Sequence, residues 1–232
     1  MNSKPFILKN IYKSNFKFIN KNQNFIWFSL ALFLIFIILG ILLPIFYENE
    51  IIDFIRSLED KISSFSAWEL INFIFFNNLK SSFFALLLGI GVCIFPLAIL
   101  IVNGYILGFV LNHSVQSGGI LVIWKLFPHG IFEIPAILIS TGLGVYLGFN
   151  LIHDFVKKYE KQDNTLILAI ISAAISPVVL FLFVFIKTLF NSELKEKLKS
   201  NLYSSLNVFI FIIVPLLIIA AIIEGLLIFF LR

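Results

Sequence analysis

The chain has 232 residues, of which 60% are hydrophobic and 13% charged, with a formal net charge of +4. A soluble domain carries about a quarter charged residues, so this composition excludes an ordinary water-soluble globular protein. The lysines lie mainly before, between and after the apolar runs, as in membrane topology signals and unlike a nucleic-acid-binding patch. The sequence therefore predicts an all-α, polytopic transmembrane bundle with five or six crossings, broken or re-entrant helices and one interfacial amphipathic helix.

Residues 1–24 carry five lysines and are predicted to form a basic cytoplasmic N-terminal segment. Residues 25–46 are uncharged and apolar, and as a helix they would extend about 33 Å, enough to cross the hydrocarbon core. This run is longer than the apolar part of a signal peptide and ends without a small-x-small cleavage site. We therefore expect it to be retained as the first transmembrane helix.

Residues 47–76 form a long polar connection in which acidic residues outnumber basic ones. Ile51, Ile55, Leu58 and Ile62 recur at helical spacing, which predicts an amphipathic helix lying in the interface. The acidic excess favours an external position for this helix. Residues 77–232 are predicted to form the transmembrane core.

Two segments of the core are too long for a single straight crossing. Residues 79–112 contain Pro96 and Asn103-Gly104, and form either one kinked, tilted helix or two short helices. In residues 119–152, the motif Pro128-His129-Gly130 predicts a helix break near Phe127, with a longer helix running from Pro128 toward Asn150. Leu166–Phe190 and Leu206–Leu231 are each predicted to cross once. The total is five or six, depending on residues 79–112, so the side of the C-terminus stays open.

Four polar residues lie inside apolar runs: Asn103, His129, Glu133 and Glu224. A charged side chain at mid-bilayer costs about 2.5–3.5 kcal/mol on insertion scales, so such groups should face the bundle interior or a wet cavity. Glu224 is expected to have a polar partner, with His129 or Asn103 as the candidates.

Three interpretations of this intramembrane polar cluster remain open. His129 and Glu133, four residues apart on one helix face, could form a hydrogen-bonded pair that holds the bundle together. They could instead belong to a proton or ion relay. Finally, His129, Glu133 and Glu224 could bind a divalent metal, although no zinc-binding motif accompanies them.

None of the familiar catalytic motifs, including GxSxG, the P-loop and GxGxxG, is present in the sequence. The single cysteine, Cys93, cannot form an internal disulfide. We therefore expect a non-enzymatic protein without a cofactor or an assigned metal.

Several segments resemble the stage II sporulation protein M family. The most specific match is PHGIFEIPA, which contains Pro128, His129, Gly130, Glu133 and Pro135. Asn77, Asn78, Asn103-Gly104 and the late Ala221-x-x-Glu224 match more loosely, in the same order and with similar spacing. The resemblance covers about residues 75–230 and implies a membrane protein of a type widespread in bacteria and archaea. In spore formers the family's namesake belongs to a membrane complex that remodels the septal cell wall.

Together, these features lead to three functional hypotheses. The leading one is a non-enzymatic scaffold of a membrane-remodelling or envelope complex, contacting lipid and other membrane proteins or further copies of itself. The second is an ion- or proton-coupled transporter or channel that uses the intramembrane His and Glu residues. The third is a metal-dependent membrane enzyme. In each case we expect a multi-pass protein of the plasma membrane with a cytoplasmic N-terminus and no nucleic-acid partner.

Overall fold

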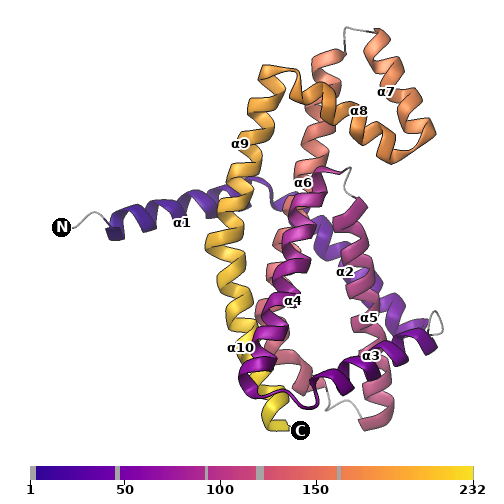
Figure 1. The fold of residues 1–232 in the computed structure, drawn as a ribbon, viewed down its shortest axis with the longest axis vertical. Helices are drawn as coiled ribbons and strands as arrows, with labels where there is room; N and C mark the ends of the chain where they lie inside the picture. The colour runs from indigo at the N-terminus through magenta and orange to yellow at the C-terminus, as the bar shows by residue number, and fades with distance from the viewer. Residues whose placement is uncertain (1–3, 45–47, 92–93, 119–122, 161–162, 232) are drawn as a thin grey trace.

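The described residues form long helices joined by short turns (Figure 1). The computed structural model describes residues 4–44, 48–91, 94–118, 123–160 and 163–231, and only their backbone at residues 4–7, 117–118, 123–129, 163, 166, 174 and 175. In chain order the elements are α1 (Lys4–Lys21), α2 (Gln23–Leu42), α3 (Glu48–Ile62), α4 (Ala67–Leu87), the 3₁₀ turn η1 (Leu88–Ile90), α5 (Ile94–Gly118), α6 (Ile123–Tyr159), α7 (Asp163–Ile175), α8 (Pro177–Leu189), α9 (Ser192–Val208), the π-turn η3 (Phe209–Ile213) and α10 (Val214–Leu231).

Within the described part of the chain, five helical segments are long and apolar enough to cross a membrane. They are Gln23–Leu42, Ala67–Ile90, Ile94–Gln116, Gly130–Tyr159 and Ser192–Leu231. The multi-pass helical bundle predicted from the sequence is thus confirmed. Because the number of crossings is odd, the start of α2 and the C-terminus lie at opposite ends of the bundle (Figure 1).

Close backbone contact joins α2 to α5. A Cβ atom on Gly104 would lie 2.9 Å from the carbonyl oxygen of Phe33, and one on Gly108 would overlap the carbonyl oxygen of Ile37. At the lower end of α2 in Figure 1, Tyr105 Oη donates to the carbonyl of Leu43 at 2.7 Å, and Asn112 Nδ2 donates to that of Ile41 at 2.9 Å. These side chains satisfy carbonyl groups that the end of a helix leaves unpaired.

The main core lies between α4, α6 and the last span. Leu86, Leu143 and Leu217, one from each helix, are at most 1% exposed. Gly89 and Gly144 face each other so closely that a Cβ on either would overlap the neighbouring backbone. Small residues at such crossings allow dispersion contacts between helices, which replace the hydrophobic driving force that lipid does not supply.

The expected amphipathic segment 47–76 is shorter in the structure. Its helix, α3, ends at Ile62, and residues 67–76 belong to the span that begins with α4. The reason is a capping box: Ser66 Oγ accepts from the Glu69 backbone N–H, and the Glu69 carboxylate accepts from the Ser66 backbone N–H at 2.8 Å. This arrangement begins a new helix at Ala67.

The long segment 79–112 resolves into two crossings. The first ends at Ile90 and the second begins at Ile94, so the helix break precedes Pro96. Pro96 then lies in the first turn of α5, where its missing N–H leaves no hydrogen bond unmade. Asn103-Gly104 does not interrupt α5.

The helix break predicted near Phe127 is absent from the described backbone. Helix α6 begins at Ile123 and continues through Pro128 to Tyr159. Pro128 is the sixth residue of α6, beyond the four N-terminal N–H groups that lack an intrahelical partner, so the helix continues through it with one backbone hydrogen bond unmade. The prediction of a long helix through Glu133 toward Asn150 agrees with α6, but its start at Pro128 was wrong.

The predicted single crossing Leu166–Phe190 is wrong. The structure divides it into α7 and α8, which pack against each other as a hairpin beside the upper end of α6 (Figure 1). Ser176 has extended backbone angles and its Oγ accepts from the Val178 N–H, while Pro177 occupies the first helical position. Each helix has 13 residues, about 20 Å, which is too short to cross the hydrocarbon core.

The helical segment that contains the predicted crossing Leu206–Leu231 is longer than that crossing. It begins at Ser192 and continues through η3 into α10. The π-turn directly precedes Pro215, whose missing N–H would interrupt regular α-helical bonding at that point.

Candidate functional site

Two of the predicted polar residues meet inside the bundle. Glu133 on α6 and Glu224 on α10 are far apart in sequence, but they line the same cavity and their carboxyl groups interact with each other. Glu224 lies about 10 Å from the end of α10 at Leu231, at 1.5 Å per residue, and therefore within the membrane-spanning part. The expectation that Asn103 would be the partner of Glu224 was wrong, because Glu133 takes that place.

A third helix contributes Asn78, whose side chain is hydrogen-bonded to the Glu133 carboxyl group. Asn78 is 9% exposed and lies in the middle of α4, about 16 Å from Ala67. Its neighbour Asn77 is exposed. In the sequence, Asn77 and Asn78 match the family pattern equally loosely. Only the rotation of α4 in the bundle shows which of the two faces Glu133.

The carboxyl groups of Glu133 and Glu224 have more hydrogen-bond acceptors than donors around them. Two carboxylates have no hydrogen-bond donor between them, so their close approach is favourable only when one group carries a proton or a cation lies between them. Glu224 Oε2 is buried and has no hydrogen-bond partner among the described residues. A proton or a cation at this position would satisfy that oxygen and reduce the repulsion between the two groups.

The packing behind Glu224 holds it against α4. Gly225, the next residue, is buried, and a Cβ on it would lie 2.6–3.1 Å from atoms of Ile71. Ala220 and Ala221 are fully buried one turn earlier. These small residues bring α10 close to α4, and they position the Glu224 side chain beside α6.

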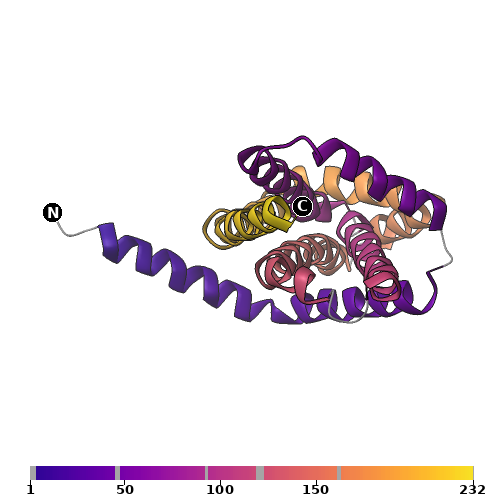
Figure 2. The same cartoon turned by 90° about the horizontal axis from the view of Figure 1, so that it is seen from below.

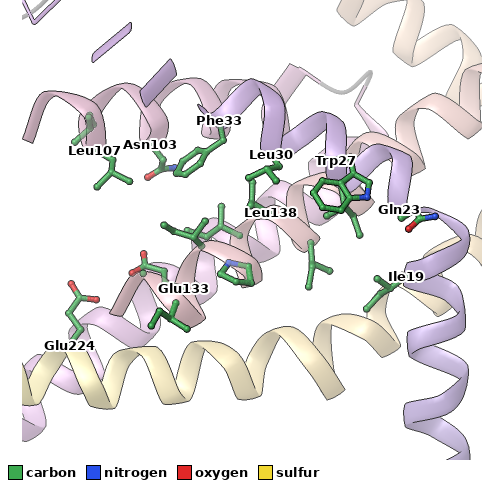
Figure 3. Close-up of a pocket in the computed structure, with 18 of the residues that line it drawn as sticks. Ile19, Gln23, Trp27, Leu30, Phe33, Asn103, Leu107, Glu133, Leu138 and Glu224 are labelled. Carbon is green, nitrogen blue, oxygen red and sulfur yellow. The ribbon is translucent and has the colours of Figure 1, made fainter. Parts of the chain in front are cut away.

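The carboxyl pair borders a cavity of about 970 Å³. Figure 3 shows Glu133 and Glu224 at one end and Ile19 and Gln23 at the other. Leu30 and Phe33 of α2 lie along one wall. The lining residues of α2 extend from Gln23 to Phe33, about 15 Å of helix. The cavity therefore reaches from the junction of α1 and α2 into the interior of the membrane-spanning bundle.

Asn103 lines the same cavity from α5. It is exposed, and its Nδ2 donates to the carbonyl of Ile99 in its own helix at 2.8 Å. Bonding to its own helix leaves the side-chain oxygen of Asn103 on the cavity wall. The structure therefore groups three of the four predicted polar residues around one cavity, although Asn103 does not touch the pair.

The remaining motif residues divide into described and undescribed positions. Gly130 and Pro135 line the cavity together with Glu133. Gly104 instead contacts α2. Pro128 and His129 lie in the backbone of α6, but their side chains are outside the described residues. The predicted pairing of His129 with Glu133 therefore stays a prediction.

The metal interpretation depends on His129, whose side chain lies outside the described residues. Among the side chains that the structure describes, no group of three or more His, Cys, Asp or Glu residues is arranged to hold a metal ion. Glu133 and Glu224 supply two carboxyl groups, whereas a catalytic zinc site has three protein ligands. Metal binding by His129, Glu133 and Glu224 therefore stays a prediction.

Comparison with known proteins supplies a family for this architecture. The model of a family described as "Stage II sporulation protein M" matches residues 29–227, which include all five candidate spans in whole or in part. An uncharacterized protein of Methanocaldococcus jannaschii is 38% identical over 77 residues, which is 33% of each chain. The match thus spans about a third of that relative's length. No solved structure matches the chain significantly.

Proposed function

The chain belongs to the stage II sporulation protein M family, and we propose that it is a transporter that couples a proton or small cation to a largely apolar solute. Glu133 and Glu224 bind the ion, and the adjoining cavity holds the solute. The observation that carries this proposal is the convergence of Glu133, Glu224 and Asn78, from three helices, at the end of a large intramembrane cavity.

The energetic cost of the carboxyl pair supports an active role. Replacing buried ionisable groups by apolar residues of similar volume is often neutral or stabilising. A helix bundle held only by packing therefore has no need of two carboxyl groups at this depth. Ionisable residues within membrane spans mark ion pathways and proton relays by default, and a pair that shares one proton can release it or exchange it for a cation.

The cavity indicates the class of solute. Its volume of about 970 Å³ lies at the upper end of the range for small-molecule sites. Its walls are mainly Leu, Ile, Val and Phe, with Gln23 and Asn20 at one end and the carboxyl pair at the other. Such a site suits an elongated molecule with an apolar body and a hydrogen-bonding or cationic end that approaches Glu133 and Glu224.

The charge distribution supports a cytoplasmic position, at the plasma membrane, for the end of the bundle that carries α1. Lys9, Lys13, Lys17 and Lys21 lie at this end, as do Lys157 and Lys158 at the end of α6. At the opposite end, α3 carries five acidic and two basic residues. Lysine-rich ends of membrane spans stay in the cytoplasm, so the cavity would extend from the cytoplasmic surface to the carboxyl pair.

Proteoliposome flux tests the transport proposal. Vesicles containing a pH-sensitive dye are given a potassium diffusion potential with valinomycin, and proton entry is followed in parallel with sodium entry. Wild type should exceed empty vesicles, and Glu133→Gln and Glu224→Gln should each lose most of this flux. Glu59→Gln, an equally conservative change on exposed α3, should retain it. Wild-type flux in both site variants would remove these residues from the pathway.

A second candidate, assembly of a membrane complex, is favoured by the α7–α8 hairpin. The hairpin lies outside the five candidate spans and exposes many large apolar side chains. They include Ile167, Leu168, Ile170, Ile171, Val178, Leu182 and Ile186. An exposed apolar surface of this kind marks a docking site for protein or membrane.

Crosslinking in native membranes followed by purification in mild detergent tests this second candidate. A stoichiometric partner or a homo-oligomer should be recovered, and Ile170→Ser should weaken its recovery, whereas Lys199→Ser on α9 should not. A monodisperse monomer in several detergents, with no crosslinked species in membranes, would rule the candidate out.

A further inference from the structure

The first helix projects sideways from the bundle. In both views α1 leaves the bundle where α2 begins, and it runs at a steep angle to the long axes of α4 and α10 (Figures 1 and 2). Its end is fixed there by Asn22, whose Nδ2 donates to the carbonyl of Phe18 at 2.9 Å. Because α2 is a membrane span that starts at Gln23, α1 lies at the height of the membrane surface and runs along it.

Contacts with the last span hold α1 in this position. Asn15, which is 4% exposed, donates from Nδ2 to the carbonyl of Asn207 at 3.3 Å. Tyr12 meets the ring of Phe211 edge-on, with centroids 6.4 Å apart. The orientation of α1 is therefore set by α9 and η3 and does not depend on the junction with α2 alone.

Helix α1 carries two distinct faces. Lys9, Lys13, Lys17 and Lys21 recur every four residues, and all four are exposed. At about 100° per residue they share one side of the helix. Leu8, Tyr12 and Phe16 form the neighbouring side and are 49%, 41% and 55% exposed. The sequence of α1 contains no acidic residue.

We propose that α1 is an in-plane anchor that binds anionic phospholipid, with its lysines at the headgroups and its exposed apolar side chains in the acyl region. A basic amphipathic helix without acidic residues has the charge and shape that such a surface attracts. Two alternatives are less suited. A protein partner would not require α1 to lie at the membrane surface. Nucleic acid would leave the apolar face of α1 uncovered. This inference is independent of the transport proposal.

Lipid selectivity of the full-length protein tests the anchor. The protein is reconstituted in phosphatidylcholine vesicles, and the motionally restricted fraction of spin-labelled phosphatidylglycerol is compared with that of spin-labelled phosphatidylcholine. Each lysine near an anionic surface increases the affinity for anionic lipid about fivefold. In this measurement the increase is averaged over the whole shell of lipid around the protein. Wild type should therefore prefer the anionic lipid at least twofold, and this preference should decrease with salt.

Matched variants assign the preference to α1. Changing the four lysines to Gln should abolish it, since Gln keeps helix propensity, whereas changing them to Arg should keep it. Lys195, Lys197 and Lys199 changed together to Gln on α9 should have little effect. Full selectivity in the four-lysine Gln variant, or none in wild type, would overturn the proposal. Size-exclusion elution and helical content check that each variant is folded.

The depth of the helix is a second readout. In a Cys93→Ser background, a fluorophore at Leu8→Cys should be quenched by lipid-borne quenchers and protected from iodide. The same fluorophore at Asn10→Cys, about 160° around the helix, should show the opposite behaviour. Equal iodide access at the two positions would mean that α1 is not embedded along one side, and would contradict the anchor.

Discussion

Glu133 and Glu224 could be predicted as interior residues from the sequence, but their contact could not. Each stands alone among apolar residues, and the cost of lipid exposure identifies it. Which two residues meet depends on the rotation and height of α6 and α10, which local sequence does not encode. For the same reason Asn78 was not separated from Asn77, although only Asn78 is buried against Glu133.

The two asparagines give a matched prediction at the residue scale. Asn78→Ala removes a hydrogen-bond partner from a buried carboxyl group, which costs about 1–3 kcal/mol. Asn77→Ala alters an exposed side chain and should stay within about 0.5 kcal/mol. Thermal unfolding in detergent should therefore show a lower Tm for Asn78→Ala alone. Equal Tm values for the two variants would contradict the assigned contact.

At the scale of helices, the sequence indicated most of the apolar segments and misplaced several of their ends. Leu166–Phe190 was predicted as one crossing, yet Ser176 and Pro177 together cap and start a second helix within it, which makes a hairpin. Pro128 was treated as a helix start, although α6 begins earlier. Ser66 and Glu69 form a capping box whose spacing is visible in the sequence, and it was overlooked because the preceding periodicity continued across it.

The contact between helices α2 and α5 determines the shape of one wall of the cavity. Gly108→Leu would force the side chain into the backbone of Ile37. Overpacking of this kind costs about 1–3 kcal/mol or more, so Tm and flux should both decrease.

Gly130→Ala is the matched control for this substitution. Its nearest neighbour is the flexible end of Ile134, at 3.3 Å, so it should be tolerated. A Gly108→Leu variant as stable as Gly130→Ala would show that α2 and α5 are not in contact.

For the whole molecule, the expected number of crossings was close, but the set of crossings differed. Residues 67–116 cross twice and residues 163–189 do not form a crossing, so the total is five. This arrangement places the C-terminal end of α6 on the same side as α1. All the described lysine-rich segments then share one side. The sequence alone could not establish this, because it left residues 79–112 open between one and two crossings and assigned a crossing to residues 166–190.

Cysteine accessibility tests this orientation. In a Cys93→Ser background, an impermeant maleimide should label Ser57→Cys on α3 in intact cells. It should label Asn10→Cys on α1 only after the membrane is opened. Labelling of Asn10→Cys in intact cells would reverse the orientation and place the cavity entrance outside.

The central claim is that Glu133 and Glu224 form a protonated carboxyl pair on the wall of an intramembrane cavity. A hydrophobic carbodiimide reacts with protonated carboxyl groups that it reaches from the lipid or a cavity, and the mass of the intact protein counts the adducts. One adduct per chain is expected in wild type and in Glu59→Gln, mapped by peptide analysis to Glu133 or Glu224. No adduct is expected in the Glu133→Gln/Glu224→Gln double variant. An unmodified wild type, or an adduct that persists in the double variant, would contradict it.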